Sequence, residues 1–170
     1  PLIPRVNEPI TIAVEARDPQ GVVRLKLFYR SPNTDWHSVE MRDGSGTIPG
    51  QASGTVIQFY IHGTDGEGVE AFFPAKAVDS RALLRVGEAN IVNTSVDTLR
   101  LILWPAEHDF MRRPEHVVSN GRVGGTLITD GDYHFDVGVR LRSSPYGRRG
   151  NRVGYNVVLG NERPYRGVHS

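Results

Sequence analysis

Short runs in which apolar and polar residues alternate recur along the whole chain, and glycine or proline separates them. The clearest run covers residues 132–142, and another covers residues 22–30. A period of two places successive side chains on opposite faces of an extended strand. Nineteen Gly and eleven Pro are scattered among the 170 residues, and they mark turns between these strands. The pattern therefore predicts a mainly β protein.

The first half of the chain predicts a small β-sandwich. Its expected strands cover residues 9–16, 22–30, 36–41, 55–62 and 69–73. Short strands at this spacing, separated by turn signals and without a helix, are typical of an Ig- or fibronectin-like sandwich. We place this domain at residues 1–78. Within its second strand, Leu25 and Leu27 are expected in the core, whereas Lys26 is expected at the surface.

The second half predicts an antiparallel β-rich domain over residues 80–170, and the stretch 75–80 is the expected boundary. Its expected strands cover residues 83–86, 98–104, 125–129, 132–142 and 153–159. Pro105 suits the first turn of a helix, because its missing N–H has no partner there. One short helix is therefore expected over 106–113. In the long strand, Tyr133 and Val137 are expected on the same, core-facing side.

The composition and the missing motifs exclude several classes of protein. The absence of cysteine excludes a disulfide scaffold, cysteine-ligated zinc and iron–sulfur clusters. The only lysines, Lys26 and Lys76, do not follow a glycine-rich loop, which excludes a P-loop nucleotide site. No apolar run approaches the roughly 20 residues of a membrane-spanning helix. The spacing of His108 and His116 does not predict a metal site, and no catalytic residue is predicted.

Charge is distributed unevenly, although the formal net charge is only +1. Residues 1–79 carry seven basic and ten acidic side chains, whereas residues 80–170 carry thirteen basic and nine acidic ones. Two interpretations are open for the arginine-rich stretch 140–166. The arginines could gather on one surface and bind phosphate groups, or they could form a solvated strand face that pairs with Asp132 and Asp136.

Four runs of sequence, in this order, resemble the N-terminal part of CotH-type proteins. The runs are RALLRV at 81–86, VSN at 118–120, YHFDVGVRLR at 133–142 and RGVH at 166–169. CotH-type proteins are an atypical secreted kinase-like family named after a spore-coat protein. The chain looks like the long form, in which an Ig- or fibronectin-like domain precedes the CotH domain. The resemblance covers nearly the whole chain.

The resemblance implies a kinase-like fold that binds ATP with Mg²⁺ or Mn²⁺ and phosphorylates protein serines. The family's catalytic segment lies downstream of this chain, so residues 80–170 are expected to be a truncated β-rich lobe. The chain by itself is then expected to need no cofactor. The residues that the resemblance assigns to the nucleotide side are Arg140, Arg142, Ser143, Ser144 and Arg152. Ser143 departs from the family, in which glycine often holds that place.

The leading functional hypothesis is an accessory or structural portion of a secreted or cell-surface bacterial CotH-like protein. Such a portion is not catalytic by itself, although its parent is then an atypical protein kinase. The expected partners are the rest of the parent chain or other protein subunits. The alternative is an adhesive extracellular module that binds carbohydrate or protein through Phe28, Trp36 and Tyr60. A polyanion is a further candidate partner, whereas nucleic acid is not expected.

Overall fold

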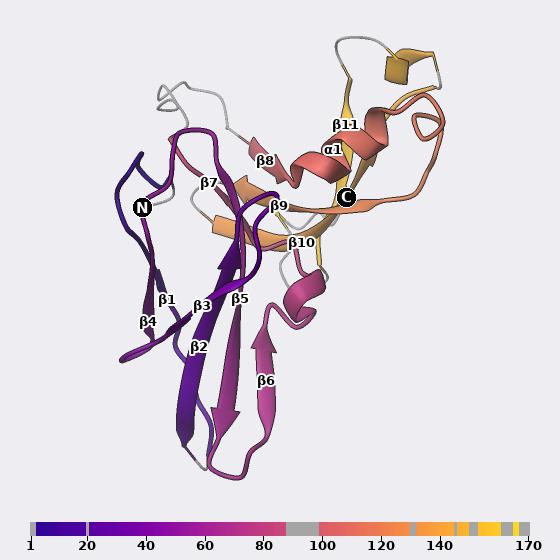
Figure 1. Ribbon diagram of the computed structural model, residues 1–170. Helices are drawn as coiled ribbons and strands as arrows, with labels where there is room; N and C mark the ends of the chain where they lie inside the picture. Colours follow the sequence, from indigo (N-terminus) through magenta and orange to yellow (C-terminus); the bar gives the residue numbers. More distant parts are fainter. Residues whose placement is uncertain are drawn as a thin grey trace. The chain divides into compact units, whose positions relative to one another are not determined.

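The computed structural model describes residues 3–19, 21–87, 99–129, 132–144, 146–149, 153–160 and 165–166. The chain divides into two compact units, Pro1–Asn90 and Ile91–Ser170, and Figure 1 shows the elements of each. Both units consist mainly of antiparallel strands. The prediction of a mainly β fold is therefore confirmed.

Unit 1, residues 1–90, contains a two-stranded and a five-stranded antiparallel sheet. Its elements are β1 (Ile10–Ala13), β2 (Val22–Arg30), β3 (His37–Glu40), β4 (Ser45–Ile48), β5 (Val56–Asp65), β6 (Glu70–Phe73), the 3-10 turn η1 (Ala77–Asp79) and β7 (Leu83–Arg85). The smaller sheet pairs β1 with β4. The larger sheet has the order β3-β2-β5-β6, and β7 also pairs with β5. In Figure 1, β2, β5 and β6 run side by side.

The core of unit 1 lies on the face of the larger sheet that carries Leu27. Leu27 stands directly opposite Ile61 of β5, and both are buried, as is Ile48 of β4. A Cβ atom added to Gly46 of β4 would lie 3.1 Å from Leu27 Cδ2, so β4 packs closely over this face. The prediction that Leu27 belongs to the core is confirmed, and Lys26 lies on the opposite face.

The structure places the end of unit 1 later than the expected domain boundary at residues 78–80. Leu83–Arg85, which was expected to begin the second domain, pairs with β5 instead. After β6, the turn η1 brings the chain back to β5, so that β7 pairs with the same edge of β5 as β6 but nearer its start. The buried Gln58 amide anchors this turn, because its Nε2 donates to the carbonyl oxygens of Val78 and Ser80. The stretch 75–80 is thus a turn within one unit.

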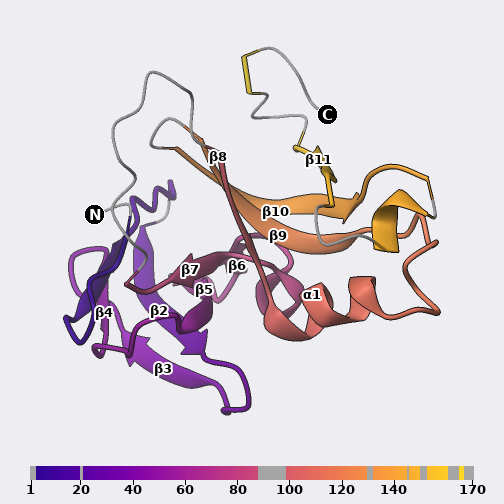
Figure 2. The same ribbon diagram turned by 90° about the horizontal axis from the view of Figure 1, so that it is seen from above.

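Unit 2, residues 91–170, contains a four-stranded sheet of order β11-β10-β9-β8 and one α-helix among its described residues. Its elements are β8 (Leu99–Leu103), α1 (Pro105–Arg112), β9 (Val123–Thr129), β10 (Asp132–Leu141), the 3-10 turn η2 (Gly147–Arg149) and β11 (Tyr155–Val158). Pro105 begins α1, as predicted. Met111 of α1 packs with Val117 and Leu141 in a buried cluster. Figure 2 shows α1 beside β9.

A β-bulge in β10 changes which side chains share a face. The register with β9 shifts between His134 and Val137, and Asp136 has a φ of 55°. Tyr133 stands opposite Ile128, whereas Val137 stands opposite Gly125, so the two side chains lie on opposite faces of the sheet. The prediction that they share a face was wrong, because a bulge inserts one residue and inverts the alternation.

Candidate functional site

Two polar or aromatic clusters stand out among the described residues, one in each unit. The first is the aromatic face of unit 1. It consists of Lys26, Phe28, Arg30, Trp36, Tyr60, His62 and Phe72. Alternation creates it, because every second residue of β2 and β5 points away from the core that holds Leu27. In the antiparallel register Phe28 faces Tyr60, and in the next pair of strands His62 faces Phe72.

The rings of the aromatic face form a continuous row. Phe28 and Tyr60 stack with centroids 4.7 Å apart and an interplanar angle of 3°. Trp36 meets Tyr60 edge-on at 5.0 Å, and His62 stacks on Phe72 at 4.7 Å. Tyr60 lies 6.4 Å from Phe72, which joins the two stacks. Two of these contacts, Phe28 with Tyr60 and His62 with Phe72, are therefore face to face, and the others are edge-on or tilted.

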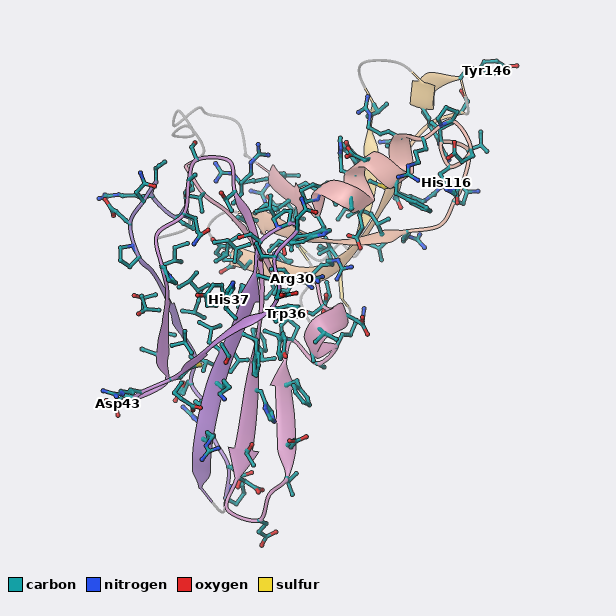
Figure 3. The ribbon with its side chains drawn as sticks, viewed as in Figure 1. Arg30, Trp36, His37, Asp43, His116 and Tyr146 are labelled. Carbon is teal, nitrogen blue, oxygen red and sulfur yellow. The ribbon has the colours of Figure 1, made fainter. Side chains whose placement is uncertain are left out.

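Cationic side chains lie over the ends of this row. The Arg30 guanidinium carbon is 4.8 Å from the Trp36 ring centroid, and Lys26 Nζ is 6.0 Å from the Phe28 centroid. Arg30 Nε also donates to Gln58 Oε1 at 2.9 Å, which fixes the guanidinium near the ring. Figure 3 shows Arg30 and Trp36 next to each other. Each arrangement has the geometry of a cation–π contact.

The carboxylates beside the aromatic face belong to neighbouring strands. Lys26 Nζ lies 3.1 Å from Glu40 Oε1, and His62 Nε2 lies 3.2 Å from Glu70 Oε1, although outside hydrogen-bond geometry. Tyr60 is 8% exposed at the centre of the row. Burial raises the pKa of its hydroxyl above the ordinary value of 10.0. The face therefore has a desolvated aromatic centre and a charged rim.

Three residues of this face were predicted from the sequence as a contact platform, and Lys26 was predicted at the surface. Phe28, Trp36 and Tyr60 were expected as a contact platform, and the structure brings them together. Arg30, His62 and Phe72 were not expected there. The signal for Arg30 was present, since it follows Phe28 at a spacing of two in a strand that was correctly predicted.

The second cluster is the arginine corner of unit 2, formed by Asn120, Arg140 and Arg148. Arg148 is only 8% exposed and its guanidinium donates four hydrogen bonds. Nε donates to the Ser143 carbonyl at 2.8 Å. Nη1 donates to the carbonyls of Ser119 and Val117, at 2.9 and 3.4 Å. Nη2 donates to Asn120 Oδ1 at 3.0 Å. The side chain thus ties the loop after β10 to the segment after α1.

Arg140 converges on the same amide oxygen. Its Nη1 donates to Asn120 Oδ1 at 2.9 Å, and its Nε donates to Asn156 Oδ1 at 3.3 Å. Within the described residues no carboxylate lies within 4.0 Å of the guanidinium of either Arg140 or Arg148. Both guanidinium groups therefore donate to neutral acceptors, which are backbone carbonyls and the side-chain amides of Asn120 and Asn156.

The structure brings some of the residues expected on the nucleotide side into this corner. Arg140 is part of it, and Ser143, whose φ is 91°, contributes its backbone carbonyl rather than its hydroxyl. Ser144 Oγ accepts a hydrogen bond from the Gly147 N–H at 3.4 Å, within the same loop. The Arg142 side chain is exposed, and Arg152 lies outside the described residues. Their assignment to a nucleotide stays a prediction.

Asn120 was not predicted from the sequence as the centre of the arginine corner. No charge or spacing signal pointed to it, and it entered only as the last residue of the VSN run. Arg148 was counted in the arginine-rich stretch without a role of its own. Both arginines are 20 residues or more away from Asn120 in the sequence. Their shared acceptor can therefore be identified only from the folded structure.

His108, His116 and Asp65, whose side chains are of types that can bind metals, have local partners. His108 Nδ1 lies 3.2 Å from Asp109 Oδ1, and the His116 ring stacks on Phe110 with centroids 3.8 Å apart. Asp65 Oδ1 accepts the N–H groups of two following residues. In the described part of the chain no group of three or more such side chains could hold a metal ion. None of the described helices is long and apolar enough to cross a membrane.

Comparison of the chain with protein-family models, with curated proteins and with solved structures finds no match in any of the three. The resemblance to CotH-type proteins therefore rests on the four sequence runs alone. It stays a prediction, as do the activity and the location that it implies.

Proposed function

We propose that the chain is a non-catalytic accessory module of a longer, secreted or cell-surface CotH-like protein, and that unit 1 binds a protein partner through the aromatic face. In this proposal unit 1 is an Ig- or fibronectin-like sandwich with β1 and β4 as its second layer. The close approach of Gly46 to Leu27 supports that assignment. A sandwich of this kind displays its binding residues on a rigid sheet, which reduces the entropy lost on binding.

The observation that carries the proposal is the row of Phe28, Trp36, Tyr60 and Phe72 with Arg30 over one end. Tryptophan, tyrosine and arginine are the residues that contribute most to binding at protein interfaces. A cluster of aromatic side chains with a polar, charged rim is also the usual anatomy of such an interface. Lys26 with Glu40 and His62 with Glu70 supply that rim.

The ring geometry favours a protein partner over a carbohydrate. A sugar that stacks on an aromatic side chain needs an open ring face. Here the faces of Phe28 and Tyr60 cover each other, and Arg30 lies over Trp36. The cationic groups beside the row complement the backbone carbonyls and carboxylates of a protein.

The arginine corner supports the accessory role of unit 2. The donors of Arg148 are largely engaged by carbonyl groups of its own unit, and Arg140 shares Asn120 with it. Such contacts stabilise the fold. Of the arginines expected on the nucleotide side, Arg142 is the exposed one among the described residues.

A photo-crosslinking amino acid at Ser38 tests the proposal. Ser38 is exposed on β3 and stands opposite Phe28, so the probe flanks the aromatic face without removing any of its residues. The full chain carrying the probe is applied to intact cells that produce the protein and then irradiated. The matched control carries the probe at Thr11, an exposed residue of β1.

The expected result is a discrete crosslinked protein at Ser38 that is absent at Thr11. It should disappear when Trp36→Ala is introduced beside the probe, while the variant keeps its circular dichroism spectrum. Three results would contradict the proposal: no crosslink, the same crosslink at both positions, or a product that glycosidases digest away.

A further inference from the structure

A cleft opens on the other face of the five-stranded sheet, at the end where β5 meets β6. Its volume is about 300 Å³. One wall is the segment 14–18, which follows β1, and the other is formed by β5 and β6. Its apolar lining includes Val14, Leu25, Ile61, Ala71 and Phe73. Ile61 and Phe73 stand opposite each other in the register, so the floor of the cleft continues the core side of the sheet.

The strand that borders this cleft is an edge strand. Within the described residues β6 pairs with β5 and stands last in the strand order β3-β2-β5-β6. All four of its residues are exposed, and Phe73 is 48% exposed. Natural proteins commonly protect such an edge with lysine, with proline or with a covering segment. The strand Glu70–Phe73 contains neither lysine nor proline.

The rim of the cleft is acidic. Glu15, Asp18 and Asp65 line it, and Arg17 is the one basic residue of the lining. Arg17 is paired with Glu15, so these two charges compensate each other, and Asp18 and Asp65 supply the excess negative charge of the lining. The electrostatic field at the mouth of the cleft therefore favours a positively charged ligand.

We propose that the outer edge of β6 is a strand-addition site for an extended segment of another protein, with apolar residues at alternate positions and basic residues at its ends. The backbone of the segment pairs with β6, and every second side chain enters the cleft beside Ala71 and Phe73. This is recognition by β-augmentation, in which main-chain hydrogen bonds give affinity and alternate pockets give specificity. The basic ends meet the acidic rim.

This site and the aromatic face lie mainly on opposite sides of β6, although Phe72 of the aromatic face also lines the cleft. Phe72 stands opposite His62 on the aromatic face, whereas Phe73 stands opposite Ile61 on the cleft side. Successive residues of β6 therefore serve opposite faces of the sheet. A failure of the crosslinking test at Ser38 would leave the strand-addition site intact, and the reverse also holds.

A synthetic peptide of alternating valine and threonine, flanked by lysines and labelled with a fluorophore, is the probe. It is titrated with the full chain, and binding is followed by anisotropy. One matched control peptide has glutamates in place of the lysines, and a second is N-methylated at alternate residues. We expect the lysine-flanked peptide to bind about tenfold more tightly than the glutamate-flanked one. N-methylation should abolish binding, because it removes the donors that pair with the edge.

Amide hydrogen exchange then locates the bound peptide. Exchange in Glu70–Phe73 should slow on binding, while exchange in the other edge strand, β3, should not change. Ala71→Trp, which fills the cleft from an exposed position, should weaken binding about tenfold or more. Thr47→Trp is the matched control on an exposed position of β4, and it should leave binding unchanged.

Four outcomes would overturn the proposal. They are no binding at peptide concentrations up to roughly 1 mM, equal binding of the lysine and glutamate peptides, protection of β3 instead of β6, and concentration-dependent self-association of the chain that excludes the peptide. The last would mean that a second copy occupies the edge. If Ala71→Trp alters the melting curve, the peptide controls and the exchange pattern still decide the question.

Discussion

The aromatic face and the arginine corner use the same kind of side chain in opposite ways. In the aromatic face, Arg30 lies over Trp36 at the surface of a sheet. In the arginine corner, Arg148 is buried and its guanidinium donates to three backbone carbonyls and one side-chain amide. A high local number of arginines is therefore not sufficient evidence of a binding surface. An arginine is available to a ligand only when its N–H donors are not already bonded to acceptors of its own chain.

The largest expected effect comes from removing the support behind the aromatic face. Leu27→Ala leaves a cavity between the two sheets, because Leu27 is fully buried opposite Ile61. It should lower the free energy of unfolding by about 3–5 kcal/mol. Lys26→Ala, one residue away, should cost less than about 1 kcal/mol, as exposed ion pairs do. Chemical denaturation followed by circular dichroism compares the two, and equal losses would mean that the face assignment of β2 is wrong.

The next largest effect tests the structural role of the arginine corner. Arg148→Ala removes four hydrogen bonds and leaves buried acceptors without a donor. It should lower stability by about 3 kcal/mol. Arg148→Lys should not restore it, because one ammonium cannot span a fork of separated acceptors. Arg142→Ala, in the same stretch but exposed, should stay within about 0.5 kcal/mol of the wild type. Similar losses of stability in Arg148→Ala and Arg142→Ala would contradict a structural role for Arg148.

A smaller effect is expected within the aromatic face itself. Trp36→Ala removes the edge-on contact with Tyr60 and the surface over which Arg30 lies. It should lower the stability of the chain by about 1 kcal/mol, because the row persists through Phe28 and Phe72. Thermal denaturation measures the change. A loss as large as that of Leu27→Ala would show that Trp36 belongs to the core and is not part of a display surface.

The smallest effect is a pH dependence centred on Tyr60. Burial raises the pKa of its hydroxyl above 10.0 in the folded chain, so the folded state keeps a proton that the unfolded state releases. The resulting stabilisation is complete below about pH 10 and is lost as the pH rises through the raised pKa. The ultraviolet titration difference between the wild type and Tyr60→Phe should show this ionisation above pH 10. A step at or below pH 10 would contradict the burial of the ring.

Strand periodicity predicted which segments are strands better than it predicted where they end and how they pair. The alternation in 22–30 gave both the strand and the inward position of Leu27, because that strand pairs regularly around Leu27. In β10 the same pattern failed to place Tyr133, since a bulge leaves no signature in hydrophobic period. The domain boundary moved because η1 resembles a linker in composition, yet Gln58 holds it against β5.

The candidate sites divide in the same way. Phe28 and Tyr60 could be named from sequence because large aromatic side chains in predicted strands are conspicuous. Their mutual stacking depends on the register between β2 and β5, which no local pattern specifies. Asn120 lies in a loop outside any strand or helix, and its role depends on two arginines that reach it from later segments. Long-range hydrogen bonds of this kind follow from the fold and cannot be inferred before it.

The amide oxygen of Asn120 that Arg140 and Arg148 share has an evolutionary consequence. A substitution at position 120 alone would leave two positive groups facing each other without the acceptor between them. A change at 148 alone would leave three carbonyls without a donor. These positions are therefore epistatic, and a lineage that loses one should lose or replace the others with it. Among relatives of this chain, Asn120, Arg140 and Arg148 should therefore be retained together or lost together.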